Sequence, residues 1–408
     1  MGRILAMPDG NWLSHTSRTF EVAKVLRQIG HEVVFASDGE YMKLPRDSGF
    51  PVLSIITIDP DRVLACSRSG RANWYDYPLI EECVEAELEL FDSFQPDLVL
   101  SDFRLPLSTS CEIAGVPLAV LLNASWTNYY AVRVKAPEHL SITNIFGKRI
   151  ANLFVPWVKN LIITFDARPF NRFRREHSLQ PFANIWDVWK GDLNLIVDIP
   201  EYGPTTNLPD NFHYIGPIMW EPDLPAPMWL EQLDSSRPVL YFSMGSTGYP
   251  RFFEQAINIF GNADYQCVMT TAGLVSLSDI PDNFYVTEYA PGSKIMEKSD
   301  MVVCHGGNGT IYQAMASGVP IIGIPTMHDQ EFNLDRVEAL GIGIHLSELK
   351  FKPEHLETAV GKILSHDSYK DNAMHYKNSM SQYEGPQNGA RLIDDWLNHG
   401  TSTVQSTI

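Results

Sequence analysis

Asp97-Leu98-Val99-Leu100-Ser101-Asp102 and Asp300-Met301-Val302-Val303-Cys304-His305 share one construction: an aspartate, a short apolar run and a polar final residue. In both halves of the chain, Gly-Val-Pro follows the final residue after thirteen positions and opens another apolar run. Apolar runs that alternate with helical segments are typical of parallel sheets in α/β proteins. The repetition predicts two similarly built α/β domains with Asp102 and His305 at equivalent strand ends, where open parallel sheets bind ligands.

The same alternation begins near the N-terminus. Ile4-Leu5-Ala6 is strand-like, apolar residues recur at helical spacing between positions 22 and 29, and Gly30 is placed to end that helix. Glu32-Val33-Val34-Phe35-Ala36 then reads as the next strand. The first 36 residues therefore predict one strand–helix–strand unit of a parallel sheet.

A proline-rich stretch marks the expected domain boundary. Four prolines fall between Gly216 and Pro227, and the strand-like Val239–Ser243 follows them. We expect an acceptor-binding domain over 1–216, a linker over 217–236, a nucleotide-sugar-binding domain over 237–385, a helix over 386–399 that packs back on the first domain, and a flexible tail over 400–408.

Composition and charge argue against several classes of protein. The formal net charge of −18 opposes nucleic acids and anionic membranes as general partners, because long-range repulsion would have to be overcome. The five cysteines are odd in number and never spaced as C-x-x-C, which is typical of reduced thiols. With no leader segment and no long apolar run, we expect a cytoplasmic protein without stable membrane insertion. The sequence carries no signal of oligomeric state.

Cys304-His-Gly-Gly-Asn-Gly-Thr310 lies between a predicted strand and a predicted helix. Glycines allow the backbone to approach a phosphate, and the unpaired N–H groups and the dipole of a helix start favour negative charge. The motif therefore fits a diphosphate. A glycine-rich turn with a packed histidine is the alternative for the motif taken alone.

Further segments accompany this motif: Ser317–Ile321, Pro325, Asp329-Gln330, Asn333, Arg336–Gly341, Asp210–Pro217 and Leu240–Ser246. Together they resemble family 1 glycosyltransferases, the antibiotic and plant secondary-metabolite enzymes of GT-B fold, along most of the chain. The resemblance implies an α/β protein of GT-B architecture, with two Rossmann-like domains whose parallel sheets face each other across a cleft. It also implies transfer of a sugar from a nucleotide diphosphate to a small acceptor.

On the donor side, the resemblance implies roles for individual residues. The diphosphate would be held by His305 and by the backbone of Gly307, Asn308, Gly309 and Thr310, with a further hydrogen bond from Ser246. Asp329 and Gln330 would contact hydroxyl groups of the donor sugar.

Recognition of the nucleoside rests on three positions. Gln313 occupies the position at which plant members have a glutamate that binds the ribose. Tyr289 occupies the position at which many members have a tryptophan that stacks on the base. An ordinary packed aromatic is the alternative for Tyr289. Gly292 replaces a glutamine that plant enzymes use near the base. We expect no cofactor other than the nucleotide sugar as co-substrate, and we favour a UDP-sugar over a dTDP-sugar.

The catalytic base is predicted at His15. In the family a histidine precedes the turn glycine by fifteen residues, and Gly30 places that position at residue 15. Inverting transfer needs a base to take the proton of the acceptor hydroxyl, and an imidazole that titrates near neutrality suits this task. Asp102 matches the family's activating aspartate and would orient the imidazole. The remaining histidine of this region, His31, is interpreted as a turn residue.

The loop around His15 departs from the family pattern, since Ser14 and Arg18 replace its glycine and proline. Arg18 is interpreted either as a contact for an anionic acceptor group or as a solvated surface side chain. Aromatic residues that include Trp74 and Trp126 are predicted to bind a planar or apolar acceptor.

Three alternatives stay open. Asp59-Pro60-Asp61 resembles the metal-binding D-x-D motif of other glycosyltransferases, but its turn-like context favours a surface turn, and we expect no metal. The aromatic stripe through Ile150, Phe154, Trp157 and Leu161 suggests a peripheral membrane enzyme acting on a lipid, although Pro156 and core packing favour a buried, interrupted helix. A sugar-nucleotide epimerase or a non-catalytic binding protein is the third alternative.

Overall fold

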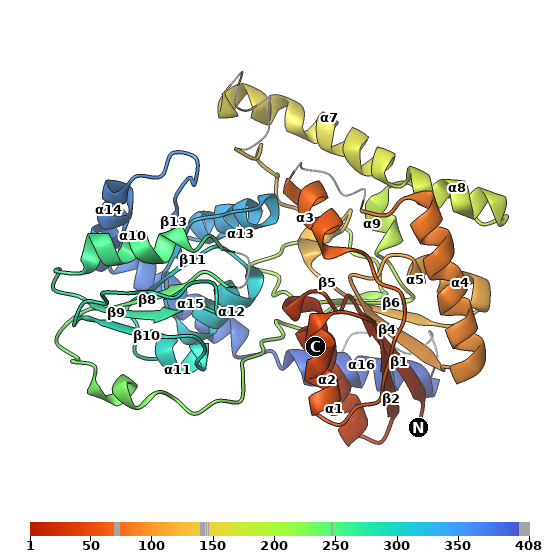
Figure 1. Ribbon diagram of the computed structural model, residues 1–408. Helices are drawn as coiled ribbons and strands as arrows, with labels where there is room; N and C mark the ends of the chain where they lie inside the picture. The colour runs from red at the N-terminus through yellow and green to blue at the C-terminus, as the bar shows by residue number, and fades with distance from the viewer. Residues whose placement is uncertain (69–73, 139–142, 144, 146, 246–247, 400–408) are drawn as a thin grey trace. The chain divides into compact units, whose positions relative to one another are not determined.

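The computed structural model describes every residue except 69–73, 139–142, 144, 146, 246–247 and 400–408. The described chain divides into two compact units (Figure 1). Unit 1 contains residues 1–134, 152–218 and those from 383 onward, and unit 2 contains residues 135–151 and 219–382. The segment 135–151, which the sequence placed in the N-terminal domain, thus packs with unit 2.

Unit 1 is built on a parallel seven-stranded sheet with the order β3-β2-β1-β4-β5-β6-β7. Its strands are β1 (Arg3–Pro8), β2 (Glu32–Ala36), β3 (Val52–Leu53), β4 (Leu98–Asp102), β5 (Leu118–Leu122), β6 (Leu193–Ile196) and β7 (Phe212–Tyr214). Its helices are α1 (Leu13–Gln28), η1 (Glu40–Met42), α2 (Lys43–Asp47), α3 (Pro60–Arg68), α4 (Tyr77–Phe94), α5 (Leu107–Ala114), η2 (Ala124–Trp126), α7 (Lys148–Asp166), α8 (Arg168–Glu176), α9 (Ile185–Val188) and α16 (Gly385–His399). Helix α7 belongs to this unit from Asn152 onward, and its first four residues belong to unit 2.

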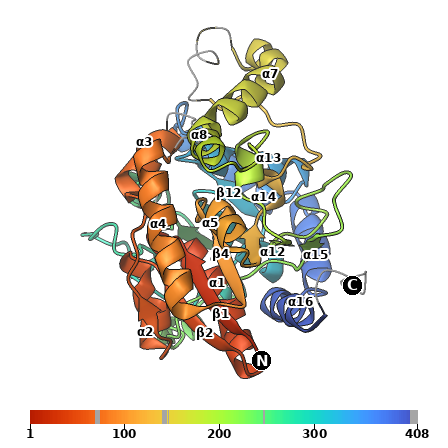
Figure 2. The ribbon, with the colours of Figure 1, turned by 90° about the vertical axis from the view of Figure 1, so that its right-hand side faces the viewer.

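Helices cover both faces of this sheet, which explains why its central strands are continuous apolar runs (Figure 2). Phe91 of α4 and Leu107 of α5 pack with Leu5 on one face. On the other face Gly389 of α16 lies close to Leu195 of β6. His31 helps to fix α16, because its Nε2 lies 3.1 Å from Oδ1 of Asp394.

Unit 2 repeats the arrangement with a parallel six-stranded sheet of order β10-β9-β8-β11-β12-β13. Its strands are β8 (Val239–Ser243), β9 (Gln266–Thr270), β10 (Phe284–Thr287), β11 (Met301–Cys304), β12 (Ile321–Gly323) and β13 (Gly343–His345). Its helices are η3 (Met228–Gln232), α10 (Arg251–Phe260), α11 (Gly292–Met296), α12 (Asn308–Ser317), α13 (His328–Ala339), α14 (Pro353–Leu364) and α15 (Ser368–Met380).

The repeated sequence stretches occupy equivalent places in the two sheets. Asp97 precedes β4 and accepts a hydrogen bond of 2.7 Å from the backbone N–H of Arg3 in β1. Asp300 precedes β11 and accepts the corresponding bond, 2.8 Å, from Val239 in β8. Each aspartate thus joins two strands at the point where the strand order of its sheet reverses. Open parallel sheets bind their ligands at the carboxyl ends of such strands.

Helix α7 differs from the sequence prediction. It continues across position 156 as a single helix, and its apolar stripe is not core, since Trp157 is 77% exposed and Leu161 is 72% exposed. No helix in the described part of the chain is both long and apolar enough to cross a membrane.

Candidate functional site

The carboxyl edge of the unit 1 sheet collects polar side chains at successive strand ends. Asp9 follows β1, Asp102 ends β4, Asn123 follows β5 and Asp198 lies just after β6. All four are buried. Pro8 and Asp102 are partners in the parallel register of β1 and β4, and the N–H of Asp9 donates to the Asp102 carbonyl at 3.0 Å. The strand that ends at Asp102 is therefore the direct neighbour of the strand that leads to His15.

His15 lies in the first turn of α1, directly against Asp102. Its Nδ1 is 2.7 Å from Oδ1 of Asp102, and both side chains are buried. Nη2 of Arg18, which can only donate, also lies 3.1 Å from Nδ1, but the contact to the carboxylate oxygen, which can only accept, is the shorter of the two and favours the proton of a neutral imidazole on Nδ1. Among the described residues none hydrogen-bonds Nε2 of His15. The pair therefore presents Nε2 as a proton acceptor, which is the geometry of a base with its orienting carboxylate.

Arg18 corrects the sequence interpretation. The solvated surface side chain is wrong, because Arg18 is buried and holds Asp102 with two hydrogen bonds, Nε to Oδ2 at 2.8 Å and Nη2 to Oδ1 at 2.7 Å. The contact with an anionic acceptor group stays a prediction. Position 18 is one helical turn after position 15, so both side chains reach the same carboxylate from one face of α1. Bidentate pairing fixes the plane of the Asp102 carboxylate as well as its charge.

The hydrogen bonding continues beyond Arg18 along the sheet edge. Nη1 of Arg18 donates to Asn123 at 2.9 Å, and the amide of Asn123 donates to Asp198 at 3.0 Å. Asp198 also accepts from the backbone N–H of Ala124 at 2.6 Å. Sequence reasoning missed Asn123 and Asp198, although a polar residue immediately after an apolar strand was the signal that identified Asp102.

An aromatic cluster surrounds His15. The ring of Phe103 stacks on the imidazole at 4.5 Å between centroids with 10° between planes. Phe103 has a φ of 65°, which is unfavourable for a bulky residue and places the ring over His15 directly after the β4 strand end. Trp126 and Trp189 stack on each other at 4.6 Å, and Trp74 stacks on Trp189 at 5.7 Å. The structure therefore brings Trp74 and Trp126 together beside the candidate base.

The aromatic cluster also contains hydrogen-bond donors. The indole N–H groups of Trp186 and Trp189 are buried, and none of the described residues accepts from them. Buried donors of this kind are costly to leave unpaired. An oxygen-bearing aromatic or apolar acceptor would both stack on these rings and satisfy the two indoles.

In unit 2, the glycine-rich motif forms the start of helix α12. Gly307 is the residue before the helix and has no side chain to cap this start, and the first turn holds no acidic residue. A Cβ added to Gly309 would meet open space. Because backbone N–H groups and the helix dipole meet here without a competing carboxylate, this end of α12 is suited to an anion.

His305 follows β11 and packs tightly against the surrounding glycines. A Cβ at Gly245 would lie 2.5 Å from the imidazole Cε1, and one at Gly307 would lie 2.6 Å from Nε2. Burial lowers the pKa of His305 to about 4, so the ring is neutral at physiological pH. Its Nδ1 is buried, and none of the described residues hydrogen-bonds it. Ser246, predicted to assist here, lies outside the described residues.

The other predicted donor residues have different surroundings. Tyr289 is 54% exposed, so its side chain is not buried in the core of unit 2. Its hydroxyl donates to the Ala272 carbonyl at 3.1 Å. Gln313 donates to the Trp220 carbonyl at 3.2 Å. Asp329 is exposed. Gln330 is buried, and its Oε1 accepts from the N–H groups of Thr326 and Met327. The oxygen of Gln330 therefore shapes the loop before α13 in this structure.

Asp59 and Asp61 lie at the start of α3. The carboxylate of Asp59 accepts a hydrogen bond of 2.9 Å from the backbone N–H of Asp61, as a helix cap does. This local role agrees with the turn interpretation of the D-x-D sequence.

The depressed pKa of His305 makes stability depend on pH. As pH falls below about 6.5, the unfolded chain binds a proton that the folded chain excludes until about pH 4, so stability decreases. Between pH 7 and pH 5 we expect this residue to cost about 2 kcal/mol of unfolding free energy. Urea denaturation at both pH values should show that loss in the wild type and not in His305→Asn. Equal losses in both proteins would contradict the burial of His305.

Comparisons with known proteins agree with these features. Residues 127–382 match the family described as UDP-glucoronosyl and UDP-glucosyl transferase. The chain is 33% identical over 367 residues to a Mycobacterium tuberculosis (strain ATCC 25177 / H37Ra) protein named PGL/p-HBAD biosynthesis glycosyltransferase, covering 89% of this chain and 85% of that relative. It is 33% identical over 375 residues to a Mycobacterium bovis (strain BCG / Pasteur 1173P2) PGL/p-HBAD biosynthesis rhamnosyltransferase, covering 91% and 82%.

Among solved structures, the spinosyn rhamnosyltransferase SpnG complexed with thymidine diphosphate superimposes with a TM-score of 0.72 at 17% identity, covering 96% of this chain and all of that one. The similarity shows the GT-B fold. With the family match, it leads to one identification: the chain belongs to the UDP-glucuronosyl and UDP-glucosyl transferase family and is a nucleotide-sugar glycosyltransferase.

Proposed function

We propose that the chain is an inverting, metal-independent glycosyltransferase that moves a sugar from a UDP- or dTDP-sugar to a hydroxyl of an aromatic or apolar acceptor. The observation that carries this proposal is the 2.7 Å contact between His15 and Asp102, with Nε2 of His15 left as the proton acceptor beside the aromatic cluster. In the proposed reaction, His15 takes the hydroxyl proton while the acceptor oxygen attacks the anomeric carbon. The bond to the diphosphate breaks on the opposite side of that carbon, which inverts its configuration.

The remaining groups have supporting roles in this proposal. Arg18 is a positioning residue, because it holds the carboxylate that orients His15 and touches no reacting atom. The start of α12 and the neutral His305 would stabilise the leaving diphosphate, so no metal is required for that charge. Tyr289 would stack on the base and Asp329 would contact the donor sugar.

A lipid-borne acceptor is the second candidate. It is favoured by the exposed apolar stripe of α7. The rhamnosyltransferase relative and the thymidine diphosphate bound to SpnG also make dTDP-rhamnose a donor to test beside UDP-glucose. Melting temperatures measured with each nucleotide sugar identify the donor, because ligand binding to the native state raises its stability.

Replacing His15 separates chemistry from donor binding. We expect His15→Ala to lower the rate of transfer by about 10² to 10⁴ while the donor still raises the melting temperature. His355→Ala, which removes an exposed histidine of α14, is the matched control and should keep full activity. Product made by the wild type should show the inverted anomeric configuration by proton NMR. Retained configuration, or a fully active His15→Ala enzyme, would disprove the mechanism.

Replacing Arg18 tests positioning against acceptor binding. We expect Arg18→Met to lower kcat with little change in the acceptor's KM, and to reduce the free energy of unfolding by about 3–5 kcal/mol because Asp102 loses a buried partner. Arg18→Lys keeps the positive charge but cannot make both hydrogen bonds to Asp102, so its kcat and its free energy of unfolding should lie between those of the wild type and Arg18→Met. Arg391→Met on the surface of α16 is the control. A selective rise in acceptor KM would show instead that Arg18 binds the acceptor.

Chelation tests the leaving-group assignment. If the start of α12 and His305 stabilise the negative charge of the leaving diphosphate, activity after dialysis against EDTA should equal that of the untreated enzyme. Loss of activity that Mg²⁺ or Mn²⁺ restores would require a metal in the reaction.

A further inference from the structure

Helix α7 carries a continuous exposed apolar stripe. The exposed members are Ile150, Leu153, Phe154, Trp157, Val158, Leu161 and Phe165. They follow one another at steps of one, three or four residues, which places them on a single face of the helix. Beside the stripe, toward one flank of the helix, Ala151 and Val155 are buried. The helix is therefore attached by one face and presents a second, larger apolar face outward.

An exposed patch of this kind is unusual for a folded chain and marks an interaction surface. The two ribbon views agree that α7 lies away from the strands of unit 1 (Figures 1 and 2). Trp157 is 77% exposed in the middle of the stripe. Amphipathic tryptophans are enriched at the boundary between lipid headgroups and acyl chains.

The charge around this stripe is opposite to that of the whole protein. Residues 148–176, which span α7 and α8, contain seven lysines and arginines and two acidic residues, Asp166 and Glu176, whereas the full chain has a formal net charge of −18. Three of the seven basic side chains, Lys148, Arg172 and Arg174, pair with a carboxylate. Asp166 is itself buried. The segment that carries the exposed stripe is thus a local basic region in an acidic protein.

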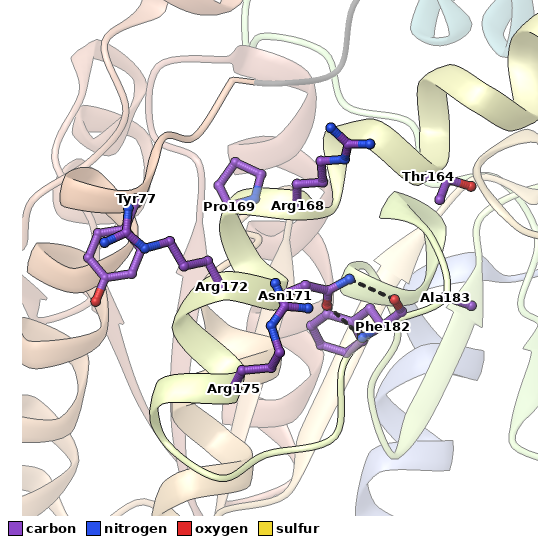
Figure 3. A pocket seen from close by; sticks show the side chains of 9 residues that line it. All are labelled: Tyr77, Thr164, Arg168, Pro169, Asn171, Arg172, Arg175, Phe182 and Ala183. Atoms are coloured by element: carbon purple, nitrogen blue, oxygen red, sulfur yellow. Dashed lines mark hydrogen bonds between the residues drawn. The ribbon is translucent and has the colours of Figure 1, made fainter.

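Three of the arginines of α8 border a hollow of about 600 Å³ (Figure 3). Arg168, Arg172 and Arg175 line it together with Tyr77 and Phe182. Arg172 lies over the ring of Tyr77 and pairs with Glu176 at 3.1 Å. Arg168 and Arg175 form no ion pair with any described residue, and both are exposed. Two guanidinium groups are therefore available for phosphate.

We propose that the α7 stripe and the α8 arginines together form a docking surface for an anionic phospholipid membrane. The stripe enters the boundary between headgroups and acyl chains, and Arg168 and Arg175 bind lipid phosphates. This inference goes beyond the proposed function, because the docking surface contains none of the residues assigned to catalysis. It would bring the enzyme to acceptors that reside in or partition into the membrane.

The combination of features favours a membrane over a second copy of the chain. A symmetric dimer through this surface would bring two basic segments together, and like charges at an interface are unfavourable. An anionic bilayer instead provides an apolar acyl-chain region that can bury the stripe and negatively charged headgroups that can pair with the arginines. Each basic residue near such a surface contributes about 1 kcal/mol, an attraction that salt weakens. Adsorption of a helix lying in the interface requires no membrane-spanning segment.

The test uses the full chain and vesicles of phosphatidylcholine with 30% phosphatidylglycerol, compared with pure phosphatidylcholine, in co-sedimentation assays. We expect binding to the anionic vesicles that weakens as salt is raised. Leu153→Ser with Trp157→Ser should lower the partition coefficient at least tenfold, and so should Arg168→Glu with Arg175→Glu. The matched controls are Met228→Ser, an exposed apolar residue of unit 2, and Arg391→Glu on α16, both of which should bind like the wild type.

Several results would overturn the inference. Absence of wild-type binding to anionic vesicles would do so, as would equal binding by the stripe variants. A stripe variant that instead lowers the molecular mass in solution would identify a surface between two copies, and one that captures less of a protein partner would identify a protein interface. A melting temperature lowered by many degrees would show that the stripe packs within the chain. His15→Ala should still bind vesicles, and the docking variants should still glycosylate a water-soluble aromatic acceptor, so this inference and the proposed function fail separately.

Discussion

The carboxylate of Asp102 is the group on which the arrangement of polar side chains at the sheet edge of unit 1 depends. It lies at the end of a buried strand, receives the imidazole of His15 on one oxygen, and is held by Arg18 through both oxygens. Burying this negative charge requires a partner, and Arg18 supplies it without occupying Nε2 of His15. The same arrangement favours a proton on Nδ1 of the imidazole, because the carboxylate accepts a hydrogen bond there at 2.7 Å whereas the competing Arg18 donor lies at 3.1 Å. Stability and the orientation of the base thus rest on one ion pair.

The two units share one parallel-sheet framework, but the groups at their strand ends differ in charge. Where the strand order of each sheet reverses, unit 1 ends β4 with a carboxylate that contacts the His15 imidazole, whereas unit 2 follows β11 with a neutral histidine and a helix start that favours anions. The equivalent aspartates Asp97 and Asp300 fix the neighbouring strands in the same way. The difference in chemistry therefore comes from the residues at the strand ends, while the framework that places them is shared.

Much of this could be predicted from the sequence, because strand-end polar residues and glycine-rich helix starts have local signatures. Asp102 and the α12 motif were identified in that way, whereas His15 was identified by its spacing from Gly30, which resembles that of the family. Arg18 was misread because its partner is 84 residues away and no local pattern reveals a buried ion pair. The α7 stripe was misread for the opposite reason: its periodicity identified an apolar face correctly, but periodicity does not say whether a face meets the core or the exterior. Phe103 was missed because its position over His15 depends on an uncommon φ angle.

The tautomer of His15 tests the central claim most directly. Proton–nitrogen correlation NMR on enzyme labelled with ¹⁵N-histidine, assigned with a His15→Gln variant, reports which ring nitrogen carries the proton in the neutral imidazole. The hydrogen bond to Asp102 predicts a proton on Nδ1 and a bare Nε2. A proton on Nε2 in the ligand-free enzyme would contradict the account, because that nitrogen could not then accept the proton of an acceptor hydroxyl.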